Sequence, residues 1–239
     1  MRMLVSVRDV PEALEAARAG VDFIDLKDPA AGALGGLPLP TLCAICAALH
    51  ADRGGATVGR PLISATIGDL PAHAVARIVH RVQRVAASGV DLVKVGVPGR
   101  GAAARPLLAA LAGLPLAVVP VLLADEGLDA DVVDAACAPA FAAVMADTEG
   151  KRAGSLLQRV AAAELRQFIA AARAAQVAVG LAGALRAADL DALAVLRPDF
   201  VGFRTAVCEG SRAGRLDPQR LNALQSQLRQ LRLPDLVPG

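Results

Sequence analysis

The stretch V-D-F-I-D-L-K-D-P, residues 21–29, contains the unit from which the fold is predicted. Its first six residues place apolar side chains on both faces of an extended chain, which is typical of a strand in a parallel sheet covered by helices. Seven similar short runs occur along the chain. The eight predicted strands cover residues 3–7, 21–26, 61–66, 91–95, 115–122, 140–146, 177–182 and 199–203.

Ala-rich stretches with helical spacing follow the predicted strands, and a Gly or Pro usually marks the change. These helices cover residues 11–19, 38–50, 71–88, 102–112, 129–137, 154–175, 186–196 and 217–231. Eight strand–helix pairs predict a (β/α)8 TIM barrel, and we expect residues 1–239 to form a single domain. The alternative is an open doubly wound sheet. That fold usually has a Gly-rich phosphate loop after its first strand, whereas residues 8–11 read R-D-V-P.

The composition argues against several classes of protein. Hydrophobic residues make up 55% of the chain and charged residues only 20%, which excludes long disordered segments. The chain has no Trp, no Tyr, five Phe and a net charge of +2, so it lacks both the aromatic platforms and the basic surface that nucleic acids require. We therefore expect no nucleic-acid partner.

Neither a membrane segment nor a metal site is expected. Residues 106–124 carry no charge, but Gly113 and two prolines interrupt them, so we interpret them as a helix, a turn and a buried strand. Cys43 and Cys46 lie in a helical pattern without the further ligands of a zinc site. The N-terminus has no apolar signal segment, which favours a cytoplasmic location.

Only three of the 25 basic residues are lysines, and each lies near the end of a predicted strand. Lys27 ends the second strand, Lys94 lies near the end of the fourth, and Lys151 follows the sixth. Active sites of this barrel lie at the carboxyl ends of the strands, and alternate strands contribute to the same interior layer. Asp25 shares a strand face with Lys27, and Asp147 precedes Lys151 by four residues. The five side chains are therefore predicted to form one catalytic site.

The predicted cluster suggests covalent chemistry on a carbonyl group. Several ammonium groups close together in an apolar barrel disfavour charging, so we expect the pKa of at least one lysine to be lowered. A neutral lysine can attack an aldehyde or ketone to form a Schiff base, and the aspartates can orient the lysines and move protons. The alternative is an ion-pair cluster that only fills the mouth of the barrel.

Phosphate binding is predicted at the loops that follow the seventh and eighth strands, because these loops often bind phosphate in this fold. The candidate residues in this region are Gly183, Gly202, Arg204, Ser211 and Arg212. Ordinary turn glycines and surface arginines are the alternative. In S-A-T-I-G-D, residues 64–69, Ser64 and Thr66 are candidates for substrate contact, and Asp69 could contact substrate or cap a helix.

Seven motifs occur, in order, across nearly the whole chain. They are L-V-S-V (4–7), I-D-L-K-D-P with G-A-L-G (24–35), S-A-T-I-G-D (64–69), V-K-V-G (93–96), D-T-x-x-K (147–151), L-A-G-A-L (181–185) and R-x-x-x-C-E-G (204–210). With these motifs, the chain resembles the (5-formylfuran-3-yl)methyl phosphate synthase family of methanofuran biosynthesis.

The resemblance implies a lyase that condenses two molecules of glyceraldehyde 3-phosphate, with loss of one phosphate and two waters and without an organic cofactor. It assigns the Schiff base to Lys27 and places Asp25, Lys94, Asp147 and Lys151 in the same active site. It also implies a role in one-carbon metabolism. Two alternatives stay open: another Schiff-base aldolase or lyase acting on triose or sugar phosphates, and a non-catalytic phosphate-binding barrel. We expect a small phosphorylated substrate and a homo-oligomer.

Overall fold

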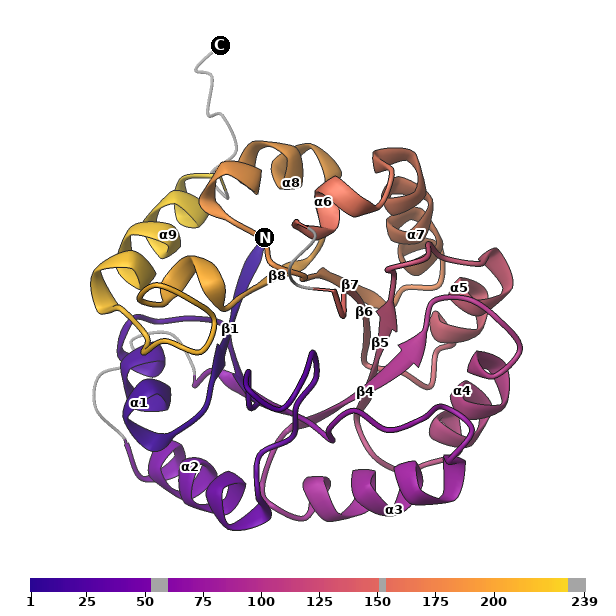
Figure 1. Cartoon of the computed structure of the whole chain (residues 1–239), viewed down its shortest axis with the longest axis horizontal. Coiled ribbons are helices and arrows are strands. Elements are labelled where there is room, and N and C mark those ends of the chain that lie inside the picture. The colour runs from indigo at the N-terminus through magenta and orange to yellow at the C-terminus, as the bar shows by residue number, and fades with distance from the viewer. Residues whose placement is uncertain (53–59, 151–153, 232–239) are drawn as a thin grey trace.

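The computed structural model describes residues 1–52, 60–150 and 154–231, and its eight parallel strands form a closed barrel (Figure 1). The strands are β1 (Arg2–Val7), β2 (Phe23–Leu26), β3 (Leu62–Thr66), β4 (Leu92–Pro98), β5 (Val118–Leu123), β6 (Ala143–Asp147), β7 (Ala178–Leu181) and β8 (Phe200–Phe203). Strand β1 pairs with β8 as well as with β2, and Leu4 lies opposite Gly202 in the closing pair. The predicted TIM barrel is confirmed, and an open sheet is excluded.

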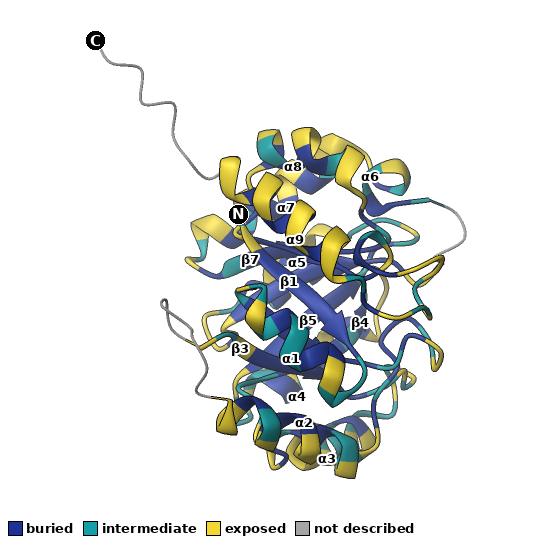
Figure 2. Ribbon diagram, turned by 90° about the vertical axis from the view of Figure 1, so that its left-hand side faces the viewer, coloured by how far each residue is buried: buried dark blue, intermediate teal, exposed yellow. Residues whose placement is uncertain are grey.

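Helices form a ring outside the strands (Figure 1). The described helices are α1 (Val10–Arg18), α2 (Leu39–Ala51), α3 (Val75–Ala86), α4 (Ala104–Ala112), α5 (Ala130–Ala136), α6 (Leu156–Arg159), α7 (Ala162–Ala174), α8 (Leu190–Leu196) and α9 (Pro218–Gln230), with short 3-10 turns η1 (Ala187–Asp189) and η2 (Thr205–Val207). Their outer surfaces are exposed and their inner faces are buried against the strands (Figure 2). The uncharged stretch 106–124 contains most of α4, a turn and strand β5, as predicted.

The helix predicted over residues 154–175 is divided into α6 and α7. Val160 and Ala161 have extended backbone angles, and the β-branched Val160 side chain is buried in the core. Ser155 and Gln158 form a capping box that defines the short helix α6. The sequence pattern missed this break because the Ala-rich spacing continues through it.

The barrel interior differs between its two ends. Apolar side chains line the amino-terminal half around a hollow of about 130 Å³, and the rings of Phe23 and Phe200 lie 5.2 Å apart there. The main members of this inner cluster are Leu4, Phe23, Val119, Val121, Met145 and Phe200. Buried polar and charged side chains occupy the carboxyl half instead. The polar groups therefore lie between this apolar cluster and the mouth of the barrel at its carboxyl end.

The described helices include none that is both long and apolar enough to cross a bilayer.

Candidate active site

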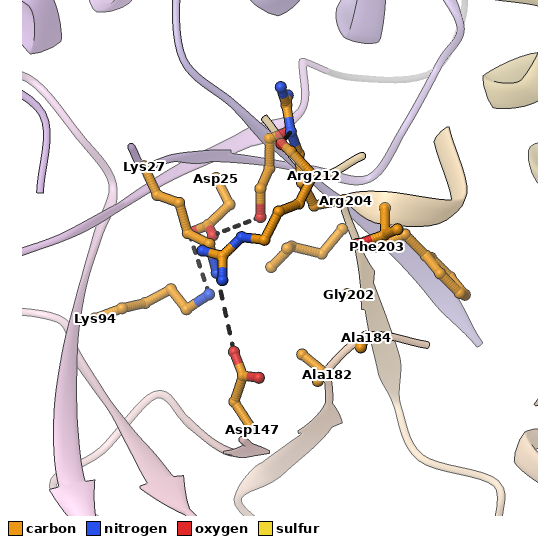
Figure 3. A pocket seen from close by; sticks show the side chains of 14 residues that line it. Asp25, Lys27, Lys94, Asp147, Ala182, Ala184, Gly202, Phe203, Arg204 and Arg212 are labelled. Carbon is orange, nitrogen blue, oxygen red and sulfur yellow. Dashed lines mark hydrogen bonds and ion pairs between the residues drawn. The ribbon is translucent and has the colours of Figure 1, made fainter. Parts of the chain in front are cut away.

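A pocket at the carboxyl end of the barrel brings together four of the five predicted catalytic residues (Figure 3). Its lining residues are Leu4, Ser6, Asp25, Lys27, Lys94, Asp147, Ala182, Gly183, Ala184, Gly202, Phe203, Arg204, Thr205 and Arg212. Asp25, Lys27, Lys94 and Asp147 come from β2, β4 and β6, or directly follow them, and their side chains point toward one another. The fifth predicted residue, Lys151, lies outside the described residues.

Asp25 is the best-anchored carboxylate of the pocket. Its Oδ1 lies 3.1 Å from Lys94 Nζ and accepts a 2.7 Å hydrogen bond from Ser64 Oγ. Its Oδ2 accepts a 3.1 Å hydrogen bond from Ser6 Oγ. Asp25 is completely buried, so these three donors replace the solvation that the carboxylate has lost. They fix its orientation and place the Lys94 ammonium group beside it.

Lys27 and Asp147 form the second charged pair. Lys27 Nζ lies 3.9 Å from Asp147 Oδ2, while Asp147 Oδ1 accepts a 2.7 Å hydrogen bond from the backbone N–H of Thr148. The backbone N–H of Lys27 still donates to Val7 in β1, so the rigid barrel wall fixes the position of this lysine. Both Lys27 and Asp147 are buried.

The two buried ion pairs, Asp25–Lys94 and Lys27–Asp147, indicate a chemical role rather than a stabilising one. Burying an ion pair costs desolvation energy that its attraction often fails to repay, so buried pairs are weak stabilisers. Ionisable groups gathered in a cleft are instead typical of functional sites. The structure thus offers two amines, two carboxylates and an apolar floor, which suits proton transfer and covalent chemistry on a carbonyl substrate.

Gly183 and Gly202 both line the pocket, on the side predicted to bind phosphate. Gly183 has a φ of +108°, and a Cβ there would lie 2.8 Å from Thr148 Oγ1 and 3.2 Å from Asp147 Oδ1. Only glycine fits this backbone comfortably. The next residue, Ala184, also has a positive φ of 49°, an uncommon conformation that is often found at ligand sites.

Arg204 does not have the geometry expected of a phosphate ligand. All five of its N–H groups donate to the protein: two to the Glu12 carboxylate and three to backbone carbonyls of Ser6, Arg212 and Gly214. The closest contact to Glu12 is 2.6 Å, and both side chains are buried. The guanidinium group therefore has no N–H left for a ligand, and its role is to hold the loop after β8.

Arg212 lies across the mouth of the pocket (Figure 3). It donates a 2.6 Å hydrogen bond to the carbonyl of Gly32, which belongs to the loop between β2 and α2. Burial lowers the pKa of Arg212 from its usual value, and the nearby Asp147 opposes this change. Because every N–H of Arg204 is already bonded, Arg212 is the arginine of the pocket lining that can meet an entering anion. The neighbouring predicted residue Ser211 is exposed, and among the described residues its hydrogen bonds stay within its own loop.

Ser64 and Thr66 do not line the pocket, although both were predicted to contact substrate. Ser64 bonds to Asp25, as described above. Thr66 Oγ1 donates a 3.0 Å hydrogen bond to the carbonyl of Gly35, and Asp69 Oδ1 accepts one of 3.1 Å from the backbone N–H of Leu34. Thr66 and Asp69 thus hold the loop between β2 and α2 over the barrel.

Several residues of the site were not predicted from the sequence. Ser6 anchors Asp25, and Glu12 anchors Arg204. The sequence D-V-P-E, residues 9–12, resembles a capping box and could have identified Glu12. Thr148 Oγ1 is buried beside Gly183 and has no hydrogen-bond partner within the described residues, so it can donate to a ligand or a water.

In the described part of the chain, no three His, Cys, Asp or Glu side chains are grouped so that they could hold a metal ion. Cys43 and Cys46 lie in α2, as expected, with Cys43 exposed and Cys46 buried.

Comparison with known proteins identifies relatives over most of the chain. The sequence profile of a family described as 4-HFC-P synthase matches residues 3–225. A protein of Methylorubrum extorquens, whose name as a (5-formylfuran-3-yl)methyl phosphate synthase is provisional, is 40% identical over 210 residues, which cover 88% of this chain and 84% of the relative. A protein of Archaeoglobus fulgidus with the same name is 31% identical over 227 residues, 89% of this chain and 93% of the relative.

Solved structures share the fold at low identity. Phosphoribosyl anthranilate isomerase from Thermus thermophilus has a TM-score of 0.66 and 18% identity, with coverage of 97% of this chain and all of that protein. Identity at this level supports the barrel architecture alone, because one barrel fold hosts many unrelated reactions.

Proposed function

The chain belongs to the 4-HFC-P synthase family, and from this premise we propose that it condenses two molecules of glyceraldehyde 3-phosphate into (5-formylfuran-3-yl)methyl phosphate. One phosphate and two water molecules leave for each product formed, so the reaction consumes neither an oxidant nor a reductant. The product would serve in the synthesis of methanofuran or an analogue. The observation that carries the proposal is the burial of two lysines and two aspartates in one pocket.

Lys27 is proposed as the residue that forms the Schiff base. As a neutral amine, its Nζ adds to the aldehyde carbon of the first substrate, and loss of water from the adduct leaves an imine. Asp147, 3.9 Å from Nζ, can take up the proton that the ammonium group must lose and return it to the departing hydroxyl. The anchored strand end favours Lys27 because a nucleophile must be held at a fixed distance from its target.

Lys94 and Asp25 are proposed to act on the second substrate. The protonated imine withdraws electrons, so the neighbouring carbon can lose a proton and attack the second carbonyl group. Asp25 can accept that proton, and the Lys94 ammonium group, 3.1 Å from Asp25, can protonate the oxygen that becomes negative. Lys151 is proposed as a further active-site residue on the family resemblance alone, because it lies outside the described residues.

The phosphate groups are proposed to bind at the loops after β7 and β8. The close backbone approach at Gly183, the position of Gly202 in the pocket lining and the guanidinium group of Arg212 support this location. A phosphate oxygen is a stronger acceptor than the single Gly32 carbonyl that Arg212 now contacts, so an entering substrate can displace that contact.

Product analysis after incubation with glyceraldehyde 3-phosphate tests the function. We expect an ultraviolet chromophore of the furan aldehyde to appear together with one equivalent of free phosphate. A sugar phosphate product without phosphate release would instead identify another Schiff-base aldolase. Binding without any turnover would indicate a phosphate-binding barrel. Either of these results would contradict the proposal.

A further inference from the structure

The hollow of about 130 Å³ inside the barrel lies on the amino-terminal side of the lysine pocket. Most of its lining residues are the first residues of their strands or lie two positions later on the same strand face. They are Arg2, Leu4, Phe23, Leu62, Ser64, Leu92, Lys94, Val119, Ala142, Ala143, Met145, Ala178 and Phe200. Bulky side chains usually fill the interior of a (β/α)8 barrel in layers, so a hollow of this size needs an explanation.

Small residues on three neighbouring strands leave this space unfilled. Ala143 and Ala178 lie opposite each other at the starts of β6 and β7, and each contributes a single side-chain carbon to the wall. The next positions on the same faces of β7 and β8 are Gly180 and Gly202. A Cβ on Gly180 would overlap the ring of Phe200, so this ring lies against the backbone of β7.

The wall of the hollow favours an aromatic occupant. The rings of Phe23 and Phe200 are tilted by 42° relative to each other, and the thioether of Met145 also lines the space. Aromatic rings attract one another in tilted and offset arrangements, and a methionine sulfur makes favourable contacts with ring edges. An aromatic guest would therefore gain more here than an aliphatic guest of the same size.

The two polar side chains at the inner end of the hollow are already engaged with the active site. Ser64 Oγ donates a 2.7 Å hydrogen bond to Asp25, and Lys94 Nζ lies 3.1 Å from the same carboxylate. A ligand rich in hydroxyl groups would lose its hydration in the hollow without gaining hydrogen bonds of equal quality. The hollow is therefore unsuited to a sugar or a sugar phosphate.

The hollow is accessible from the amino-terminal end of the barrel. Arg2, Leu62 and Ala142 line it and are exposed. Leu62 is 39% exposed and is one of three large apolar side chains with this property among the described residues. A small molecule can therefore enter without passing the lysine pocket.

Charges of both signs surround this entrance. The guanidinium carbon of Arg2 lies 4.8 Å from the centroid of the Phe23 ring. Asp22 and Asp199 directly precede β2 and β8, and their carboxylates accept hydrogen bonds from backbone N–H groups of β1 and β7. Because cationic and anionic groups are mixed, the entrance favours neither an anion nor a cation.

We propose that this hollow is a binding site for a small uncharged molecule with one aromatic ring. An apolar cavity of about 150 Å³ stays free of water and binds benzene, so a single ring matches the space available. Leu4 and Lys94 line both this hollow and the lysine pocket, which gives the two sites a common wall. The inference does not depend on the reaction proposed above.

Titration with fluorobenzene, followed by fluorine NMR, tests the inference. We expect saturable binding to wild type with a dissociation constant of about 1 mM or lower, which is attainable for a ligand of seven heavy atoms. Fluorocyclohexane has the same number of heavy atoms but no aromatic ring. We expect it to bind about threefold more weakly or worse, because it lacks the specific attraction between rings. Equal or tighter binding of fluorocyclohexane would contradict an aromatic site.

Ala178→Leu locates the bound ring, because the larger side chain occupies the hollow. We expect its affinity for fluorobenzene to fall by about tenfold or more. Ala143→Leu fills the same space from β6 and serves if Ala178→Leu fails to fold. Ala109→Leu is the matched control, since it makes the same substitution at an exposed position of α4. We expect its affinity to equal that of wild type.

Three results would overturn the inference. The first is the absence of saturable fluorobenzene binding to wild type. The second is wild-type affinity in a folded Ala178→Leu or Ala143→Leu protein, which would place the ring elsewhere. The third is displacement of fluorobenzene by inorganic phosphate, which would place the ring in the lysine pocket instead.

Discussion

The two buried lysines differ in their surroundings, and this difference predicts different roles. Lys94 lies 3.1 Å from a carboxylate that two hydroxyl groups also hold, whereas Lys27 lies 3.9 Å from Asp147 at the end of its strand. A tightly paired ammonium group is better suited to stabilise a developing negative charge than to become the neutral amine that attacks a carbonyl. Lys27, held at the end of β2 by its backbone bond to Val7, is therefore the position at which we expect the nucleophile.

Lys27→Arg is expected to abolish formation of the furan product while the fold and phosphate binding persist. A guanidinium group keeps the positive charge near Asp147 but stays protonated and does not form the imine. Chromophore formation measures the loss, and circular dichroism with titration of inorganic phosphate checks the other two properties. Turnover in the Lys27→Arg protein above about one per cent of wild type would count against this role.

Arg204→Met tests the structural role of Arg204. The substitution leaves the buried Glu12 carboxylate without its ion-pair partner, and loss of one member of a buried pair typically costs about 3–5 kcal/mol. Denaturant unfolding measures the free-energy change. Arg105→Met is the control, because the pair of Arg105 with Asp131 is exposed and is expected to contribute less than about 1 kcal/mol. Equal effects of the two substitutions would contradict the role assigned to Arg204.

At the scale of the elements, the sequence pattern predicted the strands better than the loops. All eight strands were recognised because each is a short apolar run between turn residues, and parallel strands buried on both faces have that pattern. Charged residues near the carboxyl ends of alternate strands likewise predicted that Asp25, Lys27, Lys94 and Asp147 would face one pocket. The single break between α6 and α7 was missed because local spacing does not report the tertiary contacts of Val160.

The hydrogen-bond partners of the residues at the barrel mouth could not be predicted from the sequence. Arg204 and Thr66 were predicted to contact substrate, yet Arg204 donates to Glu12, 192 residues away, and Thr66 to the Gly35 carbonyl. Such pairings depend on how segments that follow neighbouring strands meet at the barrel mouth, here β8 with β1 and β2 with β3. A polar residue at the mouth of a barrel can therefore be located from sequence, but its hydrogen-bond partner cannot.

Gly183 lies in the loop after β7, and we predict that Gly183→Ala affects this loop and the binding of substrate beside it. The new Cβ would clash with Thr148 Oγ1 in a backbone conformation that alanine disfavours, so the loop must move away from the pocket. We expect binding of glyceraldehyde 3-phosphate to weaken by about tenfold or more, measured by calorimetry. Gly101→Ala is the control, since Gly101 also has a positive φ, of +88°, but a Cβ there would meet no atom within 4 Å, and the residue lies outside the pocket. Equal affinity in the two variants would refute the placement of the phosphate site.

At the scale of the whole molecule, the closed barrel buries three of the four thiols at separate points around the ring. Cys46, Cys137 and Cys208 lie in or beside α2, α5 and η2, respectively. Burial raises the pKa of each of these thiols to about 11, so few are thiolates near neutral pH. Cys43 is exposed. The reactivity of these three thiols therefore shows whether the whole barrel opens in one cooperative step.

Alkylation with iodoacetamide at about pH 8 is expected to modify Cys43 alone in the folded chain. The thiolate is the reactive species, so a raised pKa and lack of access both protect the other three cysteines. In denaturant, all four are expected to react over the same concentration range in which the secondary structure is lost. Mass spectrometry counts the modified sites. Early reaction of Cys208 would show that the loop after β8 opens independently of the barrel.

Mapping of the reduced Schiff base tests the central claim most directly. The chain is incubated with glyceraldehyde 3-phosphate, reduced with borohydride, digested and sequenced by mass spectrometry. We predict one triose phosphate adduct per chain, on Lys27, and no adduct in the Lys27→Arg variant. An adduct found reproducibly on Lys94 or Lys151, or no adduct under conditions that yield the furan product, would contradict the account.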